Sequence, residues 1–307
     1  IGLMPVTILP RYGRMPVAHV GNWRDFQCFM GTPLVRRGFA VSFWGAILRL
    51  LDRADWASGF LSVSGLLENG PVHLGLCEAA ARMGRNAAVV HRAHRAALQC
   101  GMEPDVYLRN RVGGKRLKEF RRLSRRLGEQ GELVFSRLGA DESVAPWCEA
   151  FIALEGSGWK GRKGAAFIRS EGMQAFLRDM LCGAHAEGRL DFQRIDLDGS
   201  PVAMLVNFVT PPGSWSFKIA YDERFARFSP GVMIEIENLR CVLRNPEIAW
   251  MDSCAAPDHP MINGLWAERR TLVQVTVPLD GIRRRAVHAA CRAAETGSAL
   301  YRRARTS

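Results

Sequence analysis

Apolar and polar residues recur with two periods along this 307-residue chain, and each change of period marks a new element. Apolar residues at spacings of three and four predict amphipathic helices over residues 39–52, 72–84, 143–156, 170–187 and 230–244. Shorter apolar or alternating runs predict a strand pair within 3–20 and strands at 59–66, 87–92, 132–138, 189–197, 201–210, 215–221, 248–255 and 271–277. The dipeptide Asp198-Gly199 stands between two of these strands and predicts a tight hairpin.

The order of these elements predicts an α/β (α+β) fold in which mixed central sheets are flanked by helices. Hydrophobic residues make up 48% of the chain, which allows a sizeable core and excludes global disorder. We expect four consecutive segments: an N-terminal lobe at 1–112, a basic linking helix at 113–130, a C-terminal lobe at 131–279 and a basic helix at 280–307. The chain begins at Ile1 inside a strand pattern, so we expect its true N-terminus to be missing.

The chain has a formal net charge of +12, and positive charge is concentrated in two helical tracts. Residues 115–127 hold seven basic residues and one acid, with Leu117, Phe120, Leu123 and Leu127 at roughly helical spacing. Residues 281–307 form a second basic tract with a weak apolar face. The pattern leaves open a solvated face or binding to an anionic membrane surface or another polyanion. Aromatic residues are not interleaved with the basic ones, which disfavours nucleic-acid recognition.

Several classes of protein have signatures that this sequence lacks. No run of about 18 apolar residues is present, so no transmembrane helix is predicted. The eight cysteines stand singly, without a C-x-x-C pair, which excludes zinc-ribbon and thioredoxin motifs. Scattered cysteines of this kind fit reduced thiols in a cytoplasmic protein. Phosphate-binding loops of the Walker A or GxGxxG type are also absent.

The junction between the strand at 215–221 and the helix at 230–244 has the sequence Ser229-Pro230-Gly231. Proline suits the first helical position because no N–H is needed there. Glycine lets a ligand approach the backbone, and the free N–H groups of a helix start attract anions. The junction is therefore either an anion site or an ordinary helix start with Ser229 as its N-cap.

Together, the element order and a set of motifs resemble the GNAT acyltransferase superfamily, and most nearly its FemAB/CelD-like branch. The resemblance covers residues 100–278 by motif and 1–98 by pattern alone. It rests on Glu155, Trp159-Lys160-Gly161-Arg162, Lys218, Tyr221-Asp222, Phe228-Ser229-Pro230-Gly231 and Asp252, and on the basic helix before the second lobe.

The resemblance implies two GNAT-like lobes in tandem, with acyl-CoA as co-substrate and no metal. In GNAT proteins the coenzyme A pyrophosphate lies on a helix start of the pattern Gln/Arg-x-x-Gly-x-Gly/Ala. The matching stretch here keeps one glycine of the two, so the cofactor-binding residues implied are Arg227, Ser229, Pro230, Gly231 and Val232. CelD-like relatives share the Ser-Pro-Gly form. FemAB relatives use aminoacyl-tRNA and usually have an inserted helical hairpin that finds no room here.

The implied reaction is attack of an amine on a thioester carbonyl, which needs a base, donors for the oxyanion and an acid for the thiolate. Asp252 is a candidate to orient or deprotonate the amine, or else it caps the following loop. His259 lies in a loop near Asp258 and is a candidate general base because its ordinary pKa is close to neutral, or else it packs the loop. Tyr221 is a candidate acid for the thiolate, although a tyrosine there also suits a core.

Four further residues are candidates for substrate binding, namely Trp159, Lys160, Lys218 and Asp222. Lys218 lies in the middle of a strand and needs an anionic partner, for which phosphate, Asp222 or Asp252 are candidates. Trp159 and Lys160 are candidates to shape the acceptor pocket, although a hydrophobic anchor followed by a solvated lysine is the alternative.

The function expected from the resemblance is N-acyl transfer from acyl-CoA to an amine in the bacterial cell envelope. The acceptor would be a sphingoid-base-like lipid or an amino sugar of an exopolysaccharide. One alternative is FemAB-type transfer from aminoacyl-tRNA, the one case in which a nucleic acid is an expected partner. Another is a non-catalytic GNAT fold that acts as a membrane-associated assembly factor. We expect a cytoplasmic protein that its basic helices allow to bind the inner face of the cytoplasmic membrane.

Overall fold

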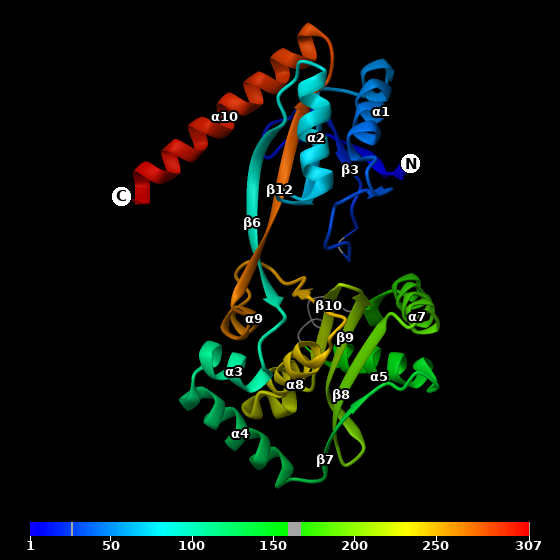
Figure 1. The fold of residues 1–307 in the computed structure, drawn as a ribbon, viewed down its shortest axis with the longest axis vertical. Coiled ribbons are helices and arrows are strands. Elements are labelled where there is room, and N and C mark those ends of the chain that lie inside the picture. The colour runs from blue at the N-terminus through cyan, green and yellow to red at the C-terminus, as the bar shows by residue number, and fades with distance from the viewer. Residues whose placement is uncertain (26, 159–166, 307) are drawn as a thin grey trace. The chain divides into compact units, whose positions relative to one another are not determined.

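The computed structural model describes residues 1–25, 27–158 and 167–306, which form two compact units (Figure 1). Unit 1 consists of residues 1–94 and 270–307, and unit 2 consists of residues 95–269. The chain passes from one unit to the other within β6 (Ala88–Gln99) and again within β12 (Glu268–Pro278). This division differs from the four consecutive segments expected from the sequence, because β12 pairs with β5 (Phe60–Leu67) of the first segment.

Unit 1 contains a sheet in the order β2 (Val6–Leu9), β3 (His19–Asn22), β5 (Phe60–Leu67) and β12, followed by the first part of β6. The β3–β5 pair is parallel, whereas the β2–β3 and β5–β12 pairs are antiparallel. Helices α1 (Ala40–Arg53) and α2 (Pro71–Arg82) bury Trp44, Leu48 and Leu76 against the apolar residues of β5 and β12. A short pair, β1 (Gly2–Leu3) with β4 (Leu34–Val35), and helix α10 (Ile282–Thr306) complete this unit.

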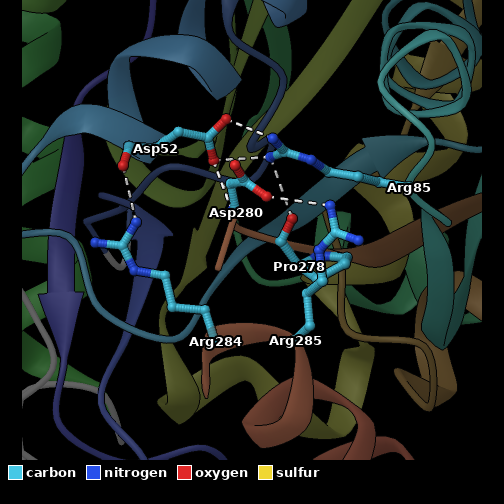
Figure 2. Close-up of polar contacts among 6 residues, drawn as sticks. All are labelled: Asp52, Arg85, Pro278, Asp280, Arg284 and Arg285. Atoms are coloured by element: carbon cyan, nitrogen blue, oxygen red, sulfur yellow. Dashed lines mark hydrogen bonds and ion pairs between the residues drawn. The ribbon is translucent and has the colours of Figure 1, made fainter. Parts of the chain in front are cut away.

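A network of charged groups joins the end of α1 to the start of α10 inside unit 1 (Figure 2). The buried guanidinium of Arg85 donates to both carboxylate oxygens of Asp52, at 2.8 and 2.5 Å. The same carboxylate accepts the backbone N–H of Asp280 at 2.8 Å. Arg284 donates to the carbonyls of Asp52 and Ala57, at 3.0 and 2.7 Å. Arg284 therefore satisfies one carbonyl of the last turn of α1 and one carbonyl of the segment that follows it.

Unit 2 contains a sheet in the order β7 (Leu133–Arg137), β8 (Leu190–Leu197), β9 (Ser200–Thr210), β10 (Gly213–Tyr221) and β11 (Trp250–Asp252), followed by the last part of β6. These neighbours are antiparallel except for β10 and β11. Asp198 and Gly199 join β8 to β9 with positive φ angles of 48° and 74°, as a two-residue hairpin of this kind requires.

Helices cover both faces of this sheet because alternate strand residues point in opposite directions. Phe192 of β8 contacts Trp147 and Phe151 of α5 (Val144–Ser157), which packs beside α7 (Glu171–Ala186). Ile195, on the other face of β8, belongs to the core with Ile234 of α8 (Pro230–Arg244). Helices α3 (Pro104–Val112), α4 (Gly114–Gly128) and α9 (Pro260–Leu265) lie around α8.

The structure confirms the predicted mixed sheet flanked by helices and places the predicted helices within a few residues of their expected bounds. It also contains helices α3 and α9, which the sequence pattern did not predict. In the part of the chain that the structure describes, no helix has both the length and the apolar character needed to cross a membrane.

Candidate functional site

The parallel strands β10 and β11 of unit 2 separate after a short pairing. They pair only from Gly213 with Trp250 to Trp215 with Asp252. Strand β10 then continues to Tyr221, and its register with β9 shifts between Ser216 and Lys218. Past Trp215, no described strand pairs with β10 on its β11 side. Ligands of open α/β sheets bind in the crevice beyond such carboxyl ends of parallel strands.

Helix α8 begins beside this end of β10, and its first turn is not capped. Ser229 has the left-handed conformation (φ 58°, ψ 51°), and its hydroxyl makes no capping hydrogen bond. Pro230 has no N–H, and the N–H groups of Val232 and Met233 donate to the Ser229 carbonyl at 3.0 and 3.1 Å. The N–H of Gly231 finds no acceptor among the described residues. The helix start thus has the free donor that an anion site needs, and the N-cap alternative for Ser229 is not observed.

The ring of Tyr221 lies against this helix start. A Cβ atom placed on Gly231 would come within 3.2 Å of Tyr221 Cδ1, which is closer than most side-chain contacts. Tyr221 also packs against the core that includes Phe228. The structure therefore brings Tyr221 and Gly231 together as one wall of the site, and the role of Tyr221 as an acid stays a prediction.

Two guanidinium groups line a hollow next to the start of α8. Arg227 and Phe228 form one side of this cavity of about 230 Å³, and Arg126 with Glu129 and Gln130 of the α4 region forms another. The guanidinium of Arg227 lies 4.7 Å from the centroid of the Phe228 ring. The sequence analysis identified Arg227 but not Arg126, because only tertiary packing selects one arginine from a helix with many.

Lys218 points to the sheet face covered by α5. Its Nζ lies 3.4 Å from Oε1 of Glu155 and 4.5 Å from the centroid of the Phe167 ring. The other oxygen of the buried Glu155 accepts the Phe167 N–H at 3.0 Å. The anionic partner of Lys218 is therefore Glu155, rather than the three candidates that the sequence suggested. Trp159 and Lys160, which follow α5, lie outside the described residues.

Asp222 and Asp252 are both held in ion pairs. Asp222 accepts the backbone N–H of Arg224 at 2.9 Å and pairs with its guanidinium at 2.6 Å, which lowers the pKa of this carboxyl. Asp252 is completely buried and lies 2.9 Å from Nε of the buried Arg95, while it accepts the Cys254 N–H at 2.9 Å. These contacts are typical of carboxylates that position a turn and a strand end.

His259 is the N-cap residue of α9. Its Nδ1 accepts the N–H of Ile262 at 3.4 Å, so in the neutral ring the proton belongs on Nε2. The ring is half-buried. In this arrangement the imidazole has no free lone pair, and it would have to release the helix before it accepted a proton.

Glu235, on the second turn of α8, is a completely buried acid that the sequence analysis did not identify. Its Oε1 accepts Nε1–H of Trp266 at 2.8 Å and an amide N–H of Asn238 at 3.1 Å. Its Oε2 has no partner among the described residues. Burial raises the pKa of Glu235 to about 7. One signal was available, namely an acid inside the apolar run 232–236.

This shifted pKa predicts a pH dependence of stability. Glu235 stays protonated in the folded state up to about pH 7, whereas the unfolded state ionises near the ordinary value of 4.5. The folded state therefore loses stability as the pH rises from 4.5 to 7, by about 3 kcal/mol in total. Urea unfolding at pH 5 and pH 8 should show this loss in the native chain and a smaller one in Glu235→Gln.

Glu247→Gln is the matched control for this measurement, because Glu247 is exposed. It should keep the native pH dependence. If Glu235→Gln and the native chain lose stability equally between pH 5 and pH 8, Glu235 is not neutral in the folded protein at pH 5.

Comparison with known proteins adds a family to this geometry. Residues 114–258 match a family model described as an acetyltransferase (GNAT) domain. A search of curated proteins finds no match.

Three solved structures illustrate the similarity in fold. The C-terminal domain of a putative lysylphosphatidylglycerol synthetase from Agrobacterium fabrum has 12% sequence identity to this chain and a TM-score of 0.52. The match covers 94% of this chain and 85% of that domain. L-PGS from Bacillus licheniformis has 10% sequence identity and a TM-score of 0.52, and the match covers 94% of this chain and 84% of L-PGS. FemX has 10% sequence identity and a TM-score of 0.50, and the match covers 90% of this chain and 84% of FemX. Residues 114–258 therefore belong to the acetyltransferase (GNAT) domain family, and FemX is among the solved structures that share the fold of the chain.

Proposed function

We propose that this protein is an N-acyltransferase that moves an acyl group from an acyl-CoA thioester to an amine. The observation that carries the proposal is the separation of β10 and β11 beside the uncapped start of α8. A phosphate placed there would accept the free N–H of Gly231 and lie near the guanidinium of Arg227.

In this proposal the residues of the site position the donor and move one proton. The amine forms a bond to the thioester carbonyl carbon, the C–S bond breaks, and the proton lost by the amine is balanced by one gained by the thiolate. We assign the proton donor to Tyr221, beside Gly231, and the base to His259, whose Nδ1 would first release the N–H of Ile262. Asp252 then acts as a positioning residue through Arg95. Positioning supplies much of the rate in such reactions.

The acceptor we propose is an envelope amine, either of a sphingoid-base-like lipid or of an amino sugar. The exposed basic residues of α4 favour an anionic membrane surface, which would bring a membrane-bound acceptor near unit 2. The names of two structural relatives also point to lipids, since both concern lysylphosphatidylglycerol synthetase or L-PGS.

Aminoacyl transfer from tRNA is the second candidate. The observation that favours it is the closeness of the basic helix α4 to the start of α8, where Arg126 and Arg227 line one hollow. A tRNA backbone would use several guanidiniums at once, and its binding would weaken steeply with salt. FemX is among the structural relatives, and the resemblance to the FemAB branch implies aminoacyl-tRNA as the donor.

The two candidates are separated by thermal unfolding in the presence of acetyl-CoA, palmitoyl-CoA, free CoA and bulk tRNA. A ligand that binds the folded state raises the melting temperature. We expect an increase with the CoA species, whose dependence on the acyl chain would narrow the acceptor class. An increase with tRNA alone, lost at high salt, would replace the first candidate by the second. No increase with any ligand would contradict both and favour a non-catalytic fold.

A further inference from the structure

A groove of about 420 Å³ lies between α4 and α8 and shares no lining residue with the hollow of Arg126 and Arg227. Its floor includes Phe135 of the edge strand β7 and Ile195 of β8, and its walls include Phe120, Met233 and Ile236. Phe135 remains 37% exposed, so the groove presents apolar surface to solvent. The acyl-transfer proposal uses none of these residues.

The rim of this groove is cationic. Arg121 and Arg125 stand on the α4 side, and Arg240 stands on the α8 side with Glu237. Arg240 forms an ion pair with Glu237, in which its Nη1 lies 2.5 Å from Oε1 of Glu237. Arg121 has no ion pair among the described residues. Arg125 has only a distant and exposed one, at 3.8 Å from Glu129. Such a pair contributes little and is easily exchanged for a ligand.

An apolar groove with two available guanidiniums on its rim is selective for an anionic amphiphile. Its volume falls in the range of small-molecule sites, about 300–1,000 Å³. An alkyl chain would cover Phe135 and Ile236, while a phosphate would bind Arg121 and Arg125, where guanidinium geometry favours bidentate contacts. We propose that the groove binds a single-chain lipid with an anionic head group.

Calorimetric titration of the full chain with dodecyl phosphate, below the concentration at which it forms micelles, tests this proposal. Dodecylphosphocholine has the same alkyl chain with a zwitterionic head, and inorganic phosphate has the head alone. We expect one dodecyl phosphate per chain, bound at least tenfold more tightly than dodecylphosphocholine, and no measurable binding of inorganic phosphate. Equal binding of the two amphiphiles, or of phosphate alone, would overturn the proposal.

Three variants locate the ligand. Ser124→Trp fills the groove from a half-buried position on its wall and should weaken dodecyl phosphate binding at least tenfold. The double variant Arg121→Gln with Arg125→Gln should weaken the binding of dodecyl phosphate at least tenfold and leave the binding of dodecylphosphocholine unchanged. The pair Lys115→Gln with Lys118→Gln removes the same charge from exposed positions outside the groove and should change binding less than twofold. Thermal unfolding checks that each variant is folded.

Each other occupant has its own signature in these titrations. If the lysine pair weakens binding as much as the arginine pair, the basic helix acts as a diffuse membrane-facing charge and the groove is not the site. If no amphiphile binds but the chain associates with itself, and Ser124→Trp stops this association, the groove holds a second copy. Either result overturns the proposal.

Discussion

Gly231→Asp is expected to abolish the thermal shift with CoA species and to lower transfer activity about a hundredfold or more. The new carboxylate would stand at the free N–H where the donor phosphate binds, and like charges in contact cost several kcal/mol. The added Cβ would also press on Tyr221 at 3.2 Å. An acidic residue in the first turn of α8 suits the helix dipole, but Gly231 is buried, so thermal unfolding without ligand has to show first that the variant is folded.

The control for this variant is Gly183→Asp, in the exposed part of α7, where an added Cβ meets no atom within 4 Å. It makes the same change of charge and should keep both the thermal shift and the activity. A native response of Gly231→Asp to coenzyme A would exclude the start of α8 as the donor site. The separation of β10 and β11 would then need another explanation.

Asp252→Asn should lower the free energy of unfolding by about 3–5 kcal/mol, which is the second large effect we expect. The substitution leaves the guanidinium of Arg95 buried without its carboxylate, and removal of one partner from a buried ion pair typically costs this much. Arg95→Met should cost a similar amount for the opposite reason. The double variant should lose clearly less than the sum of the two, as urea unfolding of all four proteins would show.

The Asp252→Asn variant also distinguishes a positioning role of Asp252 from a catalytic one. If Asp252 were the general base, Asp252→Asn would keep native stability, and the acidic limb of the pH–activity profile would shift or vanish. That outcome would contradict our assignment. Asp258→Asn changes an exposed carboxylate on the same loop and should leave stability close to native.

Local patterns were sufficient for most of the elements but not for their assembly. The helix over 230–244 and the hairpin at Asp198-Gly199 follow from periodicity and from turn chemistry, and both are in the structure. Helix α9 has only six residues inside a loop-like sequence, which is too short for a period to be visible. The pairing of β12 with β5 joins segments about two hundred residues apart, and no local pattern reports such a contact.

The candidate site shows the same limit. Ser229-Pro230-Gly231 identified the helix start from sequence, because proline and glycine have fixed meanings there. The uncapped Ser229 became visible only in the structure. The partners of Lys218 and Asp252, namely Glu155 and Arg95, are far from them in the chain. A charge in a strand or an apolar helix predicts that a partner exists, but only the fold selects it.

The discontinuity of unit 1 sets an order for folding on the ribosome. Residues 95–269 are synthesised without interruption, so unit 2 has all its strands before β12 is complete. Strand β5 has to wait until residue 278 emerges for its long antiparallel partner, and meanwhile Leu61 and Val63 lack part of their core. Domains normally close in the order of their synthesis. We therefore expect the unit that holds residues 1–94 to close last, and to be exposed to chaperones and proteases for longer than unit 2.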